Sequence, residues 1–205
     1  YESFNPNVFL NINDYLLNSI SASEIIVCSS WETSYILNKI NIPEQNKFYL
    51  VQDYEAQFNP ISSIYHFAQN SYSFPFLKIC ASRWLSNLIT KKFNTKTSYF
   101  NLSFDSDFFY PDIINKDENS IIYYGRWETP RRGFELAMES LKIVKENNND
   151  VKIKIYGSNN LAGKVPFDFI NLQQLSQQEL AAEFNKTTIG LSISLTNISL
   201  TPFEM

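Results

Sequence analysis

The sequence is poor in the residues on which several common chemistries depend. Its 205 residues include one histidine, two cysteines and five glycines. A single histidine, His66, leaves little material for enzymes that need several histidine acid/base groups. The two cysteines stand in apolar runs, which is typical of reduced thiols that pack as small hydrophobic groups. All five glycines lie between Gly125 and Gly190, so we expect tight backbone turns near a ligand in the second half.

Long apolar runs, a signal peptide and an excess of positive charge are also missing. No apolar run approaches the ~20 residues of a membrane-spanning helix. The polar opening Tyr1–Asn7 lacks the basic and apolar pattern of an export signal, which favours a cytoplasmic protein. The net charge of −4 argues against a nucleic acid partner, because binding a phosphate backbone needs a broad positive surface.

What the sequence does contain is an alternation of short apolar runs with amphipathic stretches. This rhythm predicts an α/β fold with parallel sheets. In the first half the expected strands and helices are Ile25–Cys28, Trp31–Ile40, Phe48–Gln52, Ile61–Gln69, Phe76–Cys80, Ser82–Phe93 and Thr97–Leu102. A polar stretch, Asp112–Ser120, then interrupts the pattern, so we expect two Rossmann-like lobes at residues 1–112 and 113–205.

The alternation restarts in the second half. Ser176 is the expected N-cap of a helix, with Glu179 completing a capping box. The other expected elements are strands Ile121–Tyr124, Lys152–Tyr156, Phe169–Leu172 and Ile189–Leu195, and a helix from Arg131 to Lys145. Ligands of parallel sheets bind beyond the carboxyl ends of the strands, which directs attention to the loops at Gly125, Gly157 and Thr196.

Three of the four arginines, Arg126, Arg131 and Arg132, gather around one predicted junction of strand, loop and helix. Cations at a helix start oppose the helix dipole, so this placement suggests an anionic partner. Guanidinium groups at a helix N-terminus can bind a diphosphate with paired hydrogen bonds. The alternative is a solvated basic turn.

The segment from Ser194 to Glu204 is the second candidate. It is a turn of small polar residues followed by Pro202 near an expected helix start. Backbone N–H groups at Leu200 and Thr201, together with Ser199, would bind phosphate, and Glu204 would accept hydrogen bonds from ribose hydroxyls. Ordinary helix capping explains the same residues equally well.

These segments resemble a known family. Tyr124–Leu136 contains a Gly-Arg and an Arg-Gly-Phe string that is similar to the signature of retaining GT-B glycosyltransferases. Val51–Glu55, Ile79–Leu85 and Leu195–Met205 resemble more narrowly the WsaF-type rhamnosyltransferases, which build rhamnose-containing surface glycans. The resemblance implies a GT-B fold of two lobes, with the acceptor lobe incomplete and the donor lobe truncated at its end.

The resemblance also implies the ligands. The donor would be a nucleoside-diphosphate sugar, dTDP-L-rhamnose, and the acceptor a growing surface polysaccharide. A lipid-linked acceptor would bring the protein to the inner face of the membrane. The family retains the anomeric configuration and uses neither cofactor nor metal. The oligomeric state is left open.

Site residues follow from the same resemblance. Arg126 and Arg132 would bind the donor diphosphate with help from Arg131, and Asp53 and Glu55 would face the acceptor as catalytic groups. The remaining expected donor-binding residues are Gly125, Gly157, Asn171, Gln173, Thr196, Asn197, Ser199, Leu200, Thr201 and Glu204.

Two positions depart from the family pattern. Thr196 stands where many relatives have the first of two glutamates, and a hydroxyl there suits a deoxysugar such as rhamnose. Gln173 stands where relatives often have glycine in the loop beneath the base, so the nucleobase is not assigned.

Alternatives remain at this point. Asp105 and Asp107 form an Asp-x-Asp pattern that holds metal in the other main glycosyltransferase fold, although here it directly precedes the expected lobe boundary. A non-catalytic module that binds sugar nucleotides would fit the same motifs. A sugar-nucleotide epimerase of the same fold would need histidine groups in its crevice, and one histidine argues against it.

Overall fold

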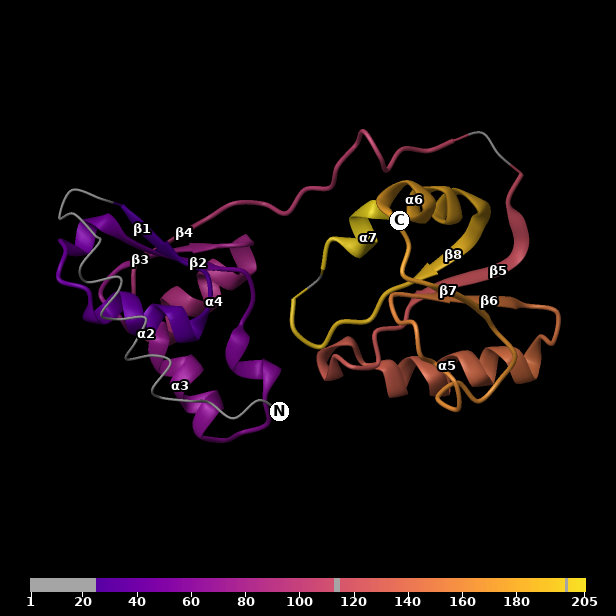
Figure 1. The fold of residues 1–205 in the computed structure, drawn as a ribbon, viewed down its shortest axis with the longest axis horizontal. Helices are drawn as coiled ribbons and strands as arrows, with labels where there is room; N and C mark the ends of the chain where they lie inside the picture. The colour runs from indigo at the N-terminus through magenta and orange to yellow at the C-terminus, as the bar shows by residue number, and fades with distance from the viewer. Residues whose placement is uncertain (1–24, 113–114, 198) are drawn as a thin grey trace. The chain divides into compact units, whose positions relative to one another are not determined.

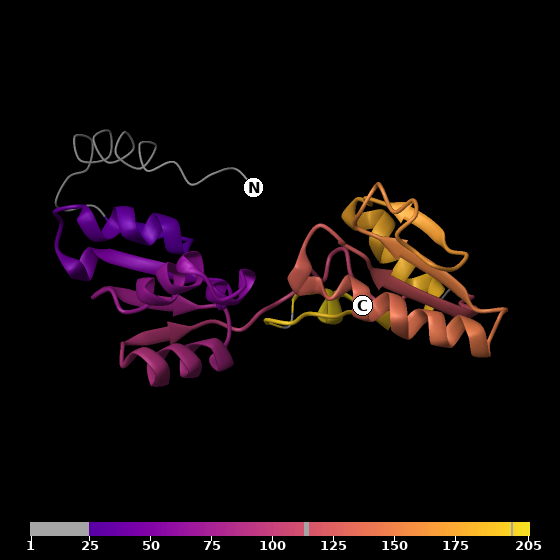
Figure 2. The same ribbon diagram turned by 90° about the horizontal axis from the view of Figure 1, so that it is seen from below.

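The computed structural model describes residues 25–112, 115–197 and 199–205. The chain forms two compact units, unit 1 (Tyr1–Leu102) and unit 2 (Ser103–Met205). Each unit contains a sheet of four parallel strands, as the alternating pattern predicts (Figures 1 and 2). Among the described residues, no helix has both the length and the apolar character needed to cross a membrane.

Unit 1 has the strand order β1-β2-β3-β4. In the described part of unit 1, each α-helix begins after a serine, Ser30, Ser62 or Ser82, whose Oγ accepts a backbone N–H of the first turn. The elements are β1 (Ile26–Cys28), α2 (Trp31–Lys39), η1 (Glu44–Asn46), β2 (Lys47–Val51), η2 (Glu55–Phe58), α3 (Ser63–Ser71), β3 (Leu77–Cys80), α4 (Arg83–Phe93) and β4 (Thr97–Tyr99).

The core of unit 1 is rich in aromatic residues and contains the buried carboxylate of Glu55. The ring of Tyr72 stacks between those of Tyr49 and Tyr54, with centroid distances of 5.8 and 5.5 Å. Glu55 is 5% exposed; its Oε2 accepts the backbone N–H of Trp31 at 2.8 Å and its Oε1 accepts the Tyr49 hydroxyl at 3.2 Å. Burial raises the pKa of Glu55 to about 7, although the hydrogen bond from Trp31 opposes the shift.

Unit 2 has the strand order β7-β6-β5-β8. Helix α5 covers one face of the sheet, and α6 and α7 lie on the other (Figure 1). Alternate residues of β5 supply both layers, because Tyr123 packs with α5 and Ile122 packs with α6. The elements are β5 (Asp117–Tyr124), η3 (Pro130–Arg132), α5 (Phe134–Asn147), β6 (Lys152–Tyr156), β7 (Ile170–Gln173), α6 (Gln177–Lys186), β8 (Thr187–Leu191) and α7 (Thr201–Glu204).

Several expected boundaries are confirmed and others shift. Strand β6 has the predicted limits, and α6 begins with the predicted capping box of Ser176 and Glu179. The strand expected at Ile189–Leu195 is wrong at its end, since β8 stops at Leu191. The strand expected at Thr97–Leu102 is likewise shorter, because β4 ends at Tyr99.

The segment that precedes β5 packs on unit 2. The Asn185 side chain donates to the carbonyl oxygen of Tyr110 at 2.9 Å and accepts the backbone N–H of Asp112 at 3.0 Å. Phe109 joins the hydrophobic cluster that contains Phe184 of α6. These contacts place residues 109–112 with unit 2.

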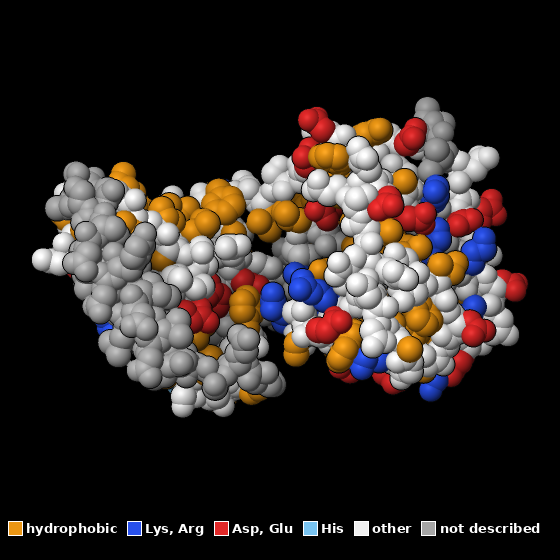
Figure 3. Space-filling view, viewed as in Figure 1, with side chains coloured by type: hydrophobic (Ala, Val, Ile, Leu, Met, Phe, Trp, Pro, Cys, Tyr) orange, Lys and Arg blue, Asp and Glu red, His pale blue; other side chains and the backbone are white. Residues whose placement is uncertain are grey.

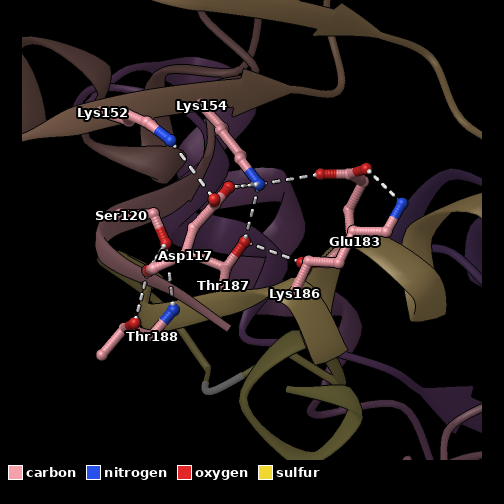
Figure 4. A network of polar contacts seen from close by, with 8 residues as sticks. All are labelled: Asp117, Ser120, Lys152, Lys154, Glu183, Lys186, Thr187 and Thr188. Carbon is pink, nitrogen blue, oxygen red and sulfur yellow. Dashed lines mark hydrogen bonds and ion pairs between the residues drawn. The ribbon is translucent and has the colours of Figure 1, made fainter. Parts of the chain in front are cut away.

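A polar network fixes the amino-terminal ends of the strands in unit 2 (Figure 4). The buried Lys154 Nζ lies 3.2 Å from Asp117 Oδ2 and 3.1 Å from Glu183 Oε2. Each carboxylate also meets a more exposed lysine, Lys152 for Asp117 and Lys186 for Glu183. The network therefore joins β5, β6 and α6 through one buried ammonium group.

Replacing the buried cation should destabilise unit 2. We expect Lys154→Met to lower the free energy of unfolding by about 1–3 kcal/mol, because it removes charge-assisted hydrogen bonds from a desolvated site. Lys152→Met is the matched control, since that side chain is 57% exposed, and should change stability little. Urea unfolding followed by circular dichroism measures both, and equal losses for the two variants would contradict the assignment.

The raised pKa of Glu55 predicts that unit 1 depends on pH. The folded unit favours the protonated carboxyl, so this stability is fully present below the ordinary pKa of 4.5 and is lost as pH rises through about 7. We expect a loss of roughly 2–3 kcal/mol across that window. Glu55→Gln should flatten the dependence, whereas the exposed Glu44→Gln should keep it. Unfolding measured at about pH 5 and pH 8 decides the matter, and an unchanged slope in Glu55→Gln would refute it.

Candidate functional site

The strand order of unit 2 reverses beside β5. Strands β6 and β7 follow on one side of β5, whereas β8 lies on its other side. Open parallel sheets bind ligands beyond the carboxyl ends of the strands at such a reversal. The loops at this point are residues 125–133 after β5 and, among the described residues, 192–197 and 199–200 after β8. They include the arginine cluster and most of the polar turn that the sequence singles out.

The arginine loop differs from the expected helix start. Instead of a helix from Arg131, the chain makes a short turn, η3, and α5 begins at Phe134. The cause is Gly133, which has a φ of +59° and ends η3 by donating its N–H to the carbonyl oxygen of Pro130. A Cβ at Gly133 would lie 2.8 Å from Ile193 Cγ2, so the close approach of the second loop also requires glycine.

The two loops are joined by their backbones. The Leu195 N–H donates to the carbonyl oxygen of Arg131 at 2.8 Å. The stretch expected to continue the strand instead turns toward the arginines. Two hydroxyl oxygens in this turn, Ser194 Oγ and Ser199 Oγ, are buried and have no hydrogen-bond partner within the described part of the chain.

No ion pair between described residues joins Arg132 to a carboxylate. Its guanidinium lies over the ring of Tyr124, 5.6 Å from the centroid, and its Nη1 is buried with no hydrogen bond to any described residue. Arg131 and Arg132 are half-buried, and Arg126 is exposed. A buried N–H of a cation without an acceptor is costly unless a ligand supplies one, and an anion is the natural ligand.

Two tyrosines at this edge were not predicted from the sequence. Tyr124 and Tyr156 are the last residues of β5 and β6, and their rings lie 5.1 Å apart. Burial raises the pKa of Tyr156, and its hydroxyl hydrogen-bonds Thr201 near Glu204. Their position at strand ends, directly before Gly125 and Gly157, is the sequence signal that could have identified them.

Helix α7 follows directly after the polar turn. Helix α7 is short; the backbone N–H groups of Phe203 and Glu204 donate to the carbonyl oxygen of Leu200 at 2.8 and 3.1 Å. The Thr201 side chain is buried, and Glu204 is half-buried with a pKa raised by desolvation. Thr196 and Asn197 are half-buried in the same turn.

Gly157, Asn171 and Gln173 form a separate group at the ends of β6 and β7. The Gly157 N–H donates to the Gln173 carbonyl oxygen at 2.8 Å, and the Gln173 N–H donates to Asn171 Oδ1 at 2.9 Å. Gln173 has a φ of +58°, a conformation that glycine adopts more easily. Gly125 connects this group to the arginine loop, since its N–H donates to the Tyr156 carbonyl oxygen at 2.9 Å.

The expected carboxylates of the acceptor lobe lie in unit 1. Asp53 and Glu55 are both buried. Asp53 Oδ1 accepts the backbone N–H of Tyr54 at 2.7 Å. We expected Glu55 to face the crevice, but both of its oxygens accept hydrogen bonds inside unit 1, because the carboxylate caps the start of α2. The catalytic roles of the two residues stay predictions.

The Asp-x-Asp pattern forms a local turn, in which the Asp107 N–H donates to Asp105 Oδ1 at 3.0 Å. Within the described ranges, no group of three His, Cys, Asp or Glu side chains is arranged to hold a metal ion. Charge is mixed over the face of unit 2 in Figure 3, where basic side chains gather at one place and elsewhere alternate with acidic ones. That distribution suits a local anion site.

Comparison with known proteins supports this architecture. Residues 119–205 match the family model described as WsaF, C-terminal domain. No curated protein sequence matches the chain. A mutant of TarM from S. aureus, in a crystal structure with Fondaparinux, alpha-GlcNAc-glycerol and UDP, is similar with a TM-score of 0.73 and 14% identity. A second structure of TarM gives a TM-score of 0.72 and 15% identity.

The likeness extends over 96% of this chain but over 42% of TarM in both structures. The chain thus spans less than half the length of that protein. At 14–15% identity the likeness establishes the architecture and not the reaction. The chain has the parallel-sheet α/β fold of the GT-B glycosyltransferases.

Proposed function

We propose that the chain is part of a glycosyltransferase that binds a nucleoside-diphosphate sugar at the carboxyl edge of the second sheet. One observation carries the proposal: Arg132 Nη1, Ser194 Oγ and Ser199 Oγ are buried in the two loops that meet at the strand reversal, and no described residue offers them a hydrogen bond. A diphosphate offers the acceptor oxygens and the negative charge that these groups lack. The match of residues 119–205 to the family model described as WsaF, C-terminal domain, supports the same interpretation.

Electrostatic stabilisation of the leaving group would be the main catalytic contribution. Transfer of the sugar leaves negative charge on the nucleoside diphosphate, and donors fixed before the reaction stabilise that charge. Arg132 is fixed by the ring of Tyr124, and Arg126 and Arg131 stand in the same loop. This arrangement supports a mechanism in which guanidinium groups, rather than a metal ion, neutralise the diphosphate.

The polar turn would bind the rest of the nucleotide. The Ser194 and Ser199 hydroxyls can donate to phosphate oxygens, and Glu204 can accept from ribose hydroxyls. Thr196, where relatives carry a glutamate, favours a 6-deoxy sugar, and we propose dTDP-L-rhamnose as the donor. Asn171 and Gln173 lie in β7, where they pair with the last two residues of β6. We propose them as the neighbours of the base.

We propose a growing surface polysaccharide as the acceptor, with the anomeric configuration retained. Asp53 and Glu55 are the proposed groups near the acceptor hydroxyl, and both oxygens of Glu55 accept hydrogen bonds in unit 1. Glu55 would then act by fixing the loop that carries Asp53. A lipid-linked acceptor would hold the protein at the inner face of the membrane.

A sugar-nucleotide-binding module without catalysis is the second candidate. The two candidates share the nucleotide site and differ in whether a sugar is transferred.

Loss of the buried guanidinium should weaken nucleotide binding. We expect Arg132→Ala to reduce affinity for dTDP by about 10- to 100-fold, as for a charge-assisted hydrogen bond of about 1.5–3 kcal/mol. Arg83→Ala is the matched control, since Arg83 is exposed on unit 1 and donates to the Tyr99 hydroxyl. Isothermal titration calorimetry measures both, and unchanged affinity in Arg132→Ala would remove this residue from the site.

The choice of donor can be tested with a panel of sugar nucleotides. We expect this chain, or any longer chain that contains it, to bind dTDP-L-rhamnose more tightly than UDP-glucose. Thr196→Glu should reverse part of that preference, because a carboxylate accepts from the 6-hydroxyl that rhamnose lacks. Transfer to a rhamnose-containing acceptor, followed by mass spectrometry, separates an enzyme from a binding module. A donor that binds but is never transferred would favour the module.

A further inference from the structure

Unit 2 contains a cavity that the proposed nucleotide site does not use. Its volume is about 400 Å³, within the range of ~300–1,000 Å³ typical of small-molecule sites. It lies between the arginine loop, the first half of α5 and the loop that follows β6. The lining residues are Trp127, Phe134, Glu135, Met138, Glu139, Gly163, Lys164, Val165 and Pro166.

Its walls combine an apolar surface with charged groups that lack ion-pair partners. None of the four ion pairs among the described residues involves Glu135, Glu139 or Lys164. Glu135 and Glu139 are one helical turn apart on α5, and like charges at this spacing repel each other. A ligand that donates hydrogen bonds to both would relieve this repulsion.

Trp127 supplies the aromatic wall. Lys164 Nζ lies 3.5 Å from the centre of its ring, so one face of the indole already contacts a cation. The indole nitrogen is buried and has no hydrogen-bond partner within the described ranges. This N–H is therefore a donor without an acceptor, in the wall of a cavity that also offers carboxylate acceptors.

The balance of charge narrows the class of ligand. Two carboxylates against one ammonium give the cavity a net charge of −1, which disfavours phosphates and other anions. Walls of Phe134, Met138 and Val165 disfavour a small hydrated cation. A ring with hydroxyl groups at its edge and C–H groups on its face fits both conditions, because hydroxyls donate to the carboxylates and accept from Lys164.

We propose that this cavity is a carbohydrate subsite that binds one uncharged sugar ring and is distinct from the nucleotide site at Arg132. Glu135 and Glu139 accept hydrogen bonds from sugar hydroxyls, and Lys164 donates to another. Trp127 and Phe134 contact the apolar face of the ring. The subsite does not require the proposed nucleotide site to be correct.

The indole N–H signals of the three tryptophans test this directly. In a ¹⁵N-labelled sample of the whole chain, Trp127→Phe identifies the signal of Trp127 among those of Trp31 and Trp84. Methyl α-L-rhamnopyranoside and methyl α-D-glucopyranoside are the probes, at millimolar concentrations. We expect at least one of them to shift the Trp127 signal in a saturable way while the Trp84 signal stays in place. Saturation-transfer difference spectra of the same glycosides give an independent readout on the unmodified chain.

Matched variants locate the binding. Glu139→Gln replaces a charged acceptor with a weaker neutral one, and Lys164→Met removes a donor, so each should weaken glycoside binding by about 5- to 10-fold. Glu146→Gln changes an exposed carboxylate near the end of the same helix and should have no effect. Arg132→Ala should leave glycoside binding intact even where dTDP binding is lost, so the two proposals fail separately.

The proposal is overturned if no glycoside moves the Trp127 signal and none shows saturation transfer. It is also overturned if methylammonium or inorganic phosphate shifts that signal as strongly as the glycosides do. Equal weakening by Glu146→Gln and Glu139→Gln would likewise remove the cavity as the place of binding.

Discussion

A single backbone hydrogen bond, from the Leu195 N–H to the Arg131 carbonyl oxygen, connects the two loops on which the candidate site depends. The loops follow β5 and β8, which are adjacent in the sheet but far apart in the sequence. Strand β8 lies on the side of β5 opposite to β6. Ile193 also packs on the hydrophobic cluster that contains Phe134, so this packing and the hydrogen bond together hold the turn after β8 beside the arginine loop. The bond requires close approach, and Gly133 permits it because a side chain there would meet Ile193. Gly133 is therefore the residue that allows the two loops of the candidate site to approach each other.

The two edges of the sheet in unit 2 differ in whether a cationic side chain is paired with carboxylates. At the amino-terminal edge, Lys154 is buried between two carboxylates and hydrogen-bonded to Thr187, so its charge is compensated. At the carboxyl edge, Arg132 rests on an aromatic ring and keeps a buried N–H without an acceptor. Unpaired buried polar groups cost free energy, and proteins tend to keep them where function needs them. This contrast supports the proposal of a ligand site at the carboxyl edge without drawing on any comparison.

The sequence predicted the elements better than their ends. Regular features such as strand Lys152–Tyr156 and the capping box at Ser176 were found because local patterns determine them. The helix start at Arg131 and the strand end at Leu195 were misplaced, because both depend on the contact between two loops that are distant in sequence. Gly133 was visible as a glycine, but its left-handed φ and its neighbour Ile193 were not.

Only part of the candidate site could be recognised from the sequence, because some of its residues are brought together by the packing of the strands. The arginines and the polar turn stand out by composition, whereas Tyr124 and Tyr156 look like ordinary strand residues in a chain rich in tyrosine. Their importance comes from register: the two residues pair across β5 and β6, which brings one ring under Arg132 and the hydroxyl of the other to Thr201. Glu55 shows the converse case, because a carboxylate next to an expected crevice became a buried helix cap once α2 and β2 were packed. Pairing in the sheet, rather than residue type, thus decides which polar groups remain available to a ligand.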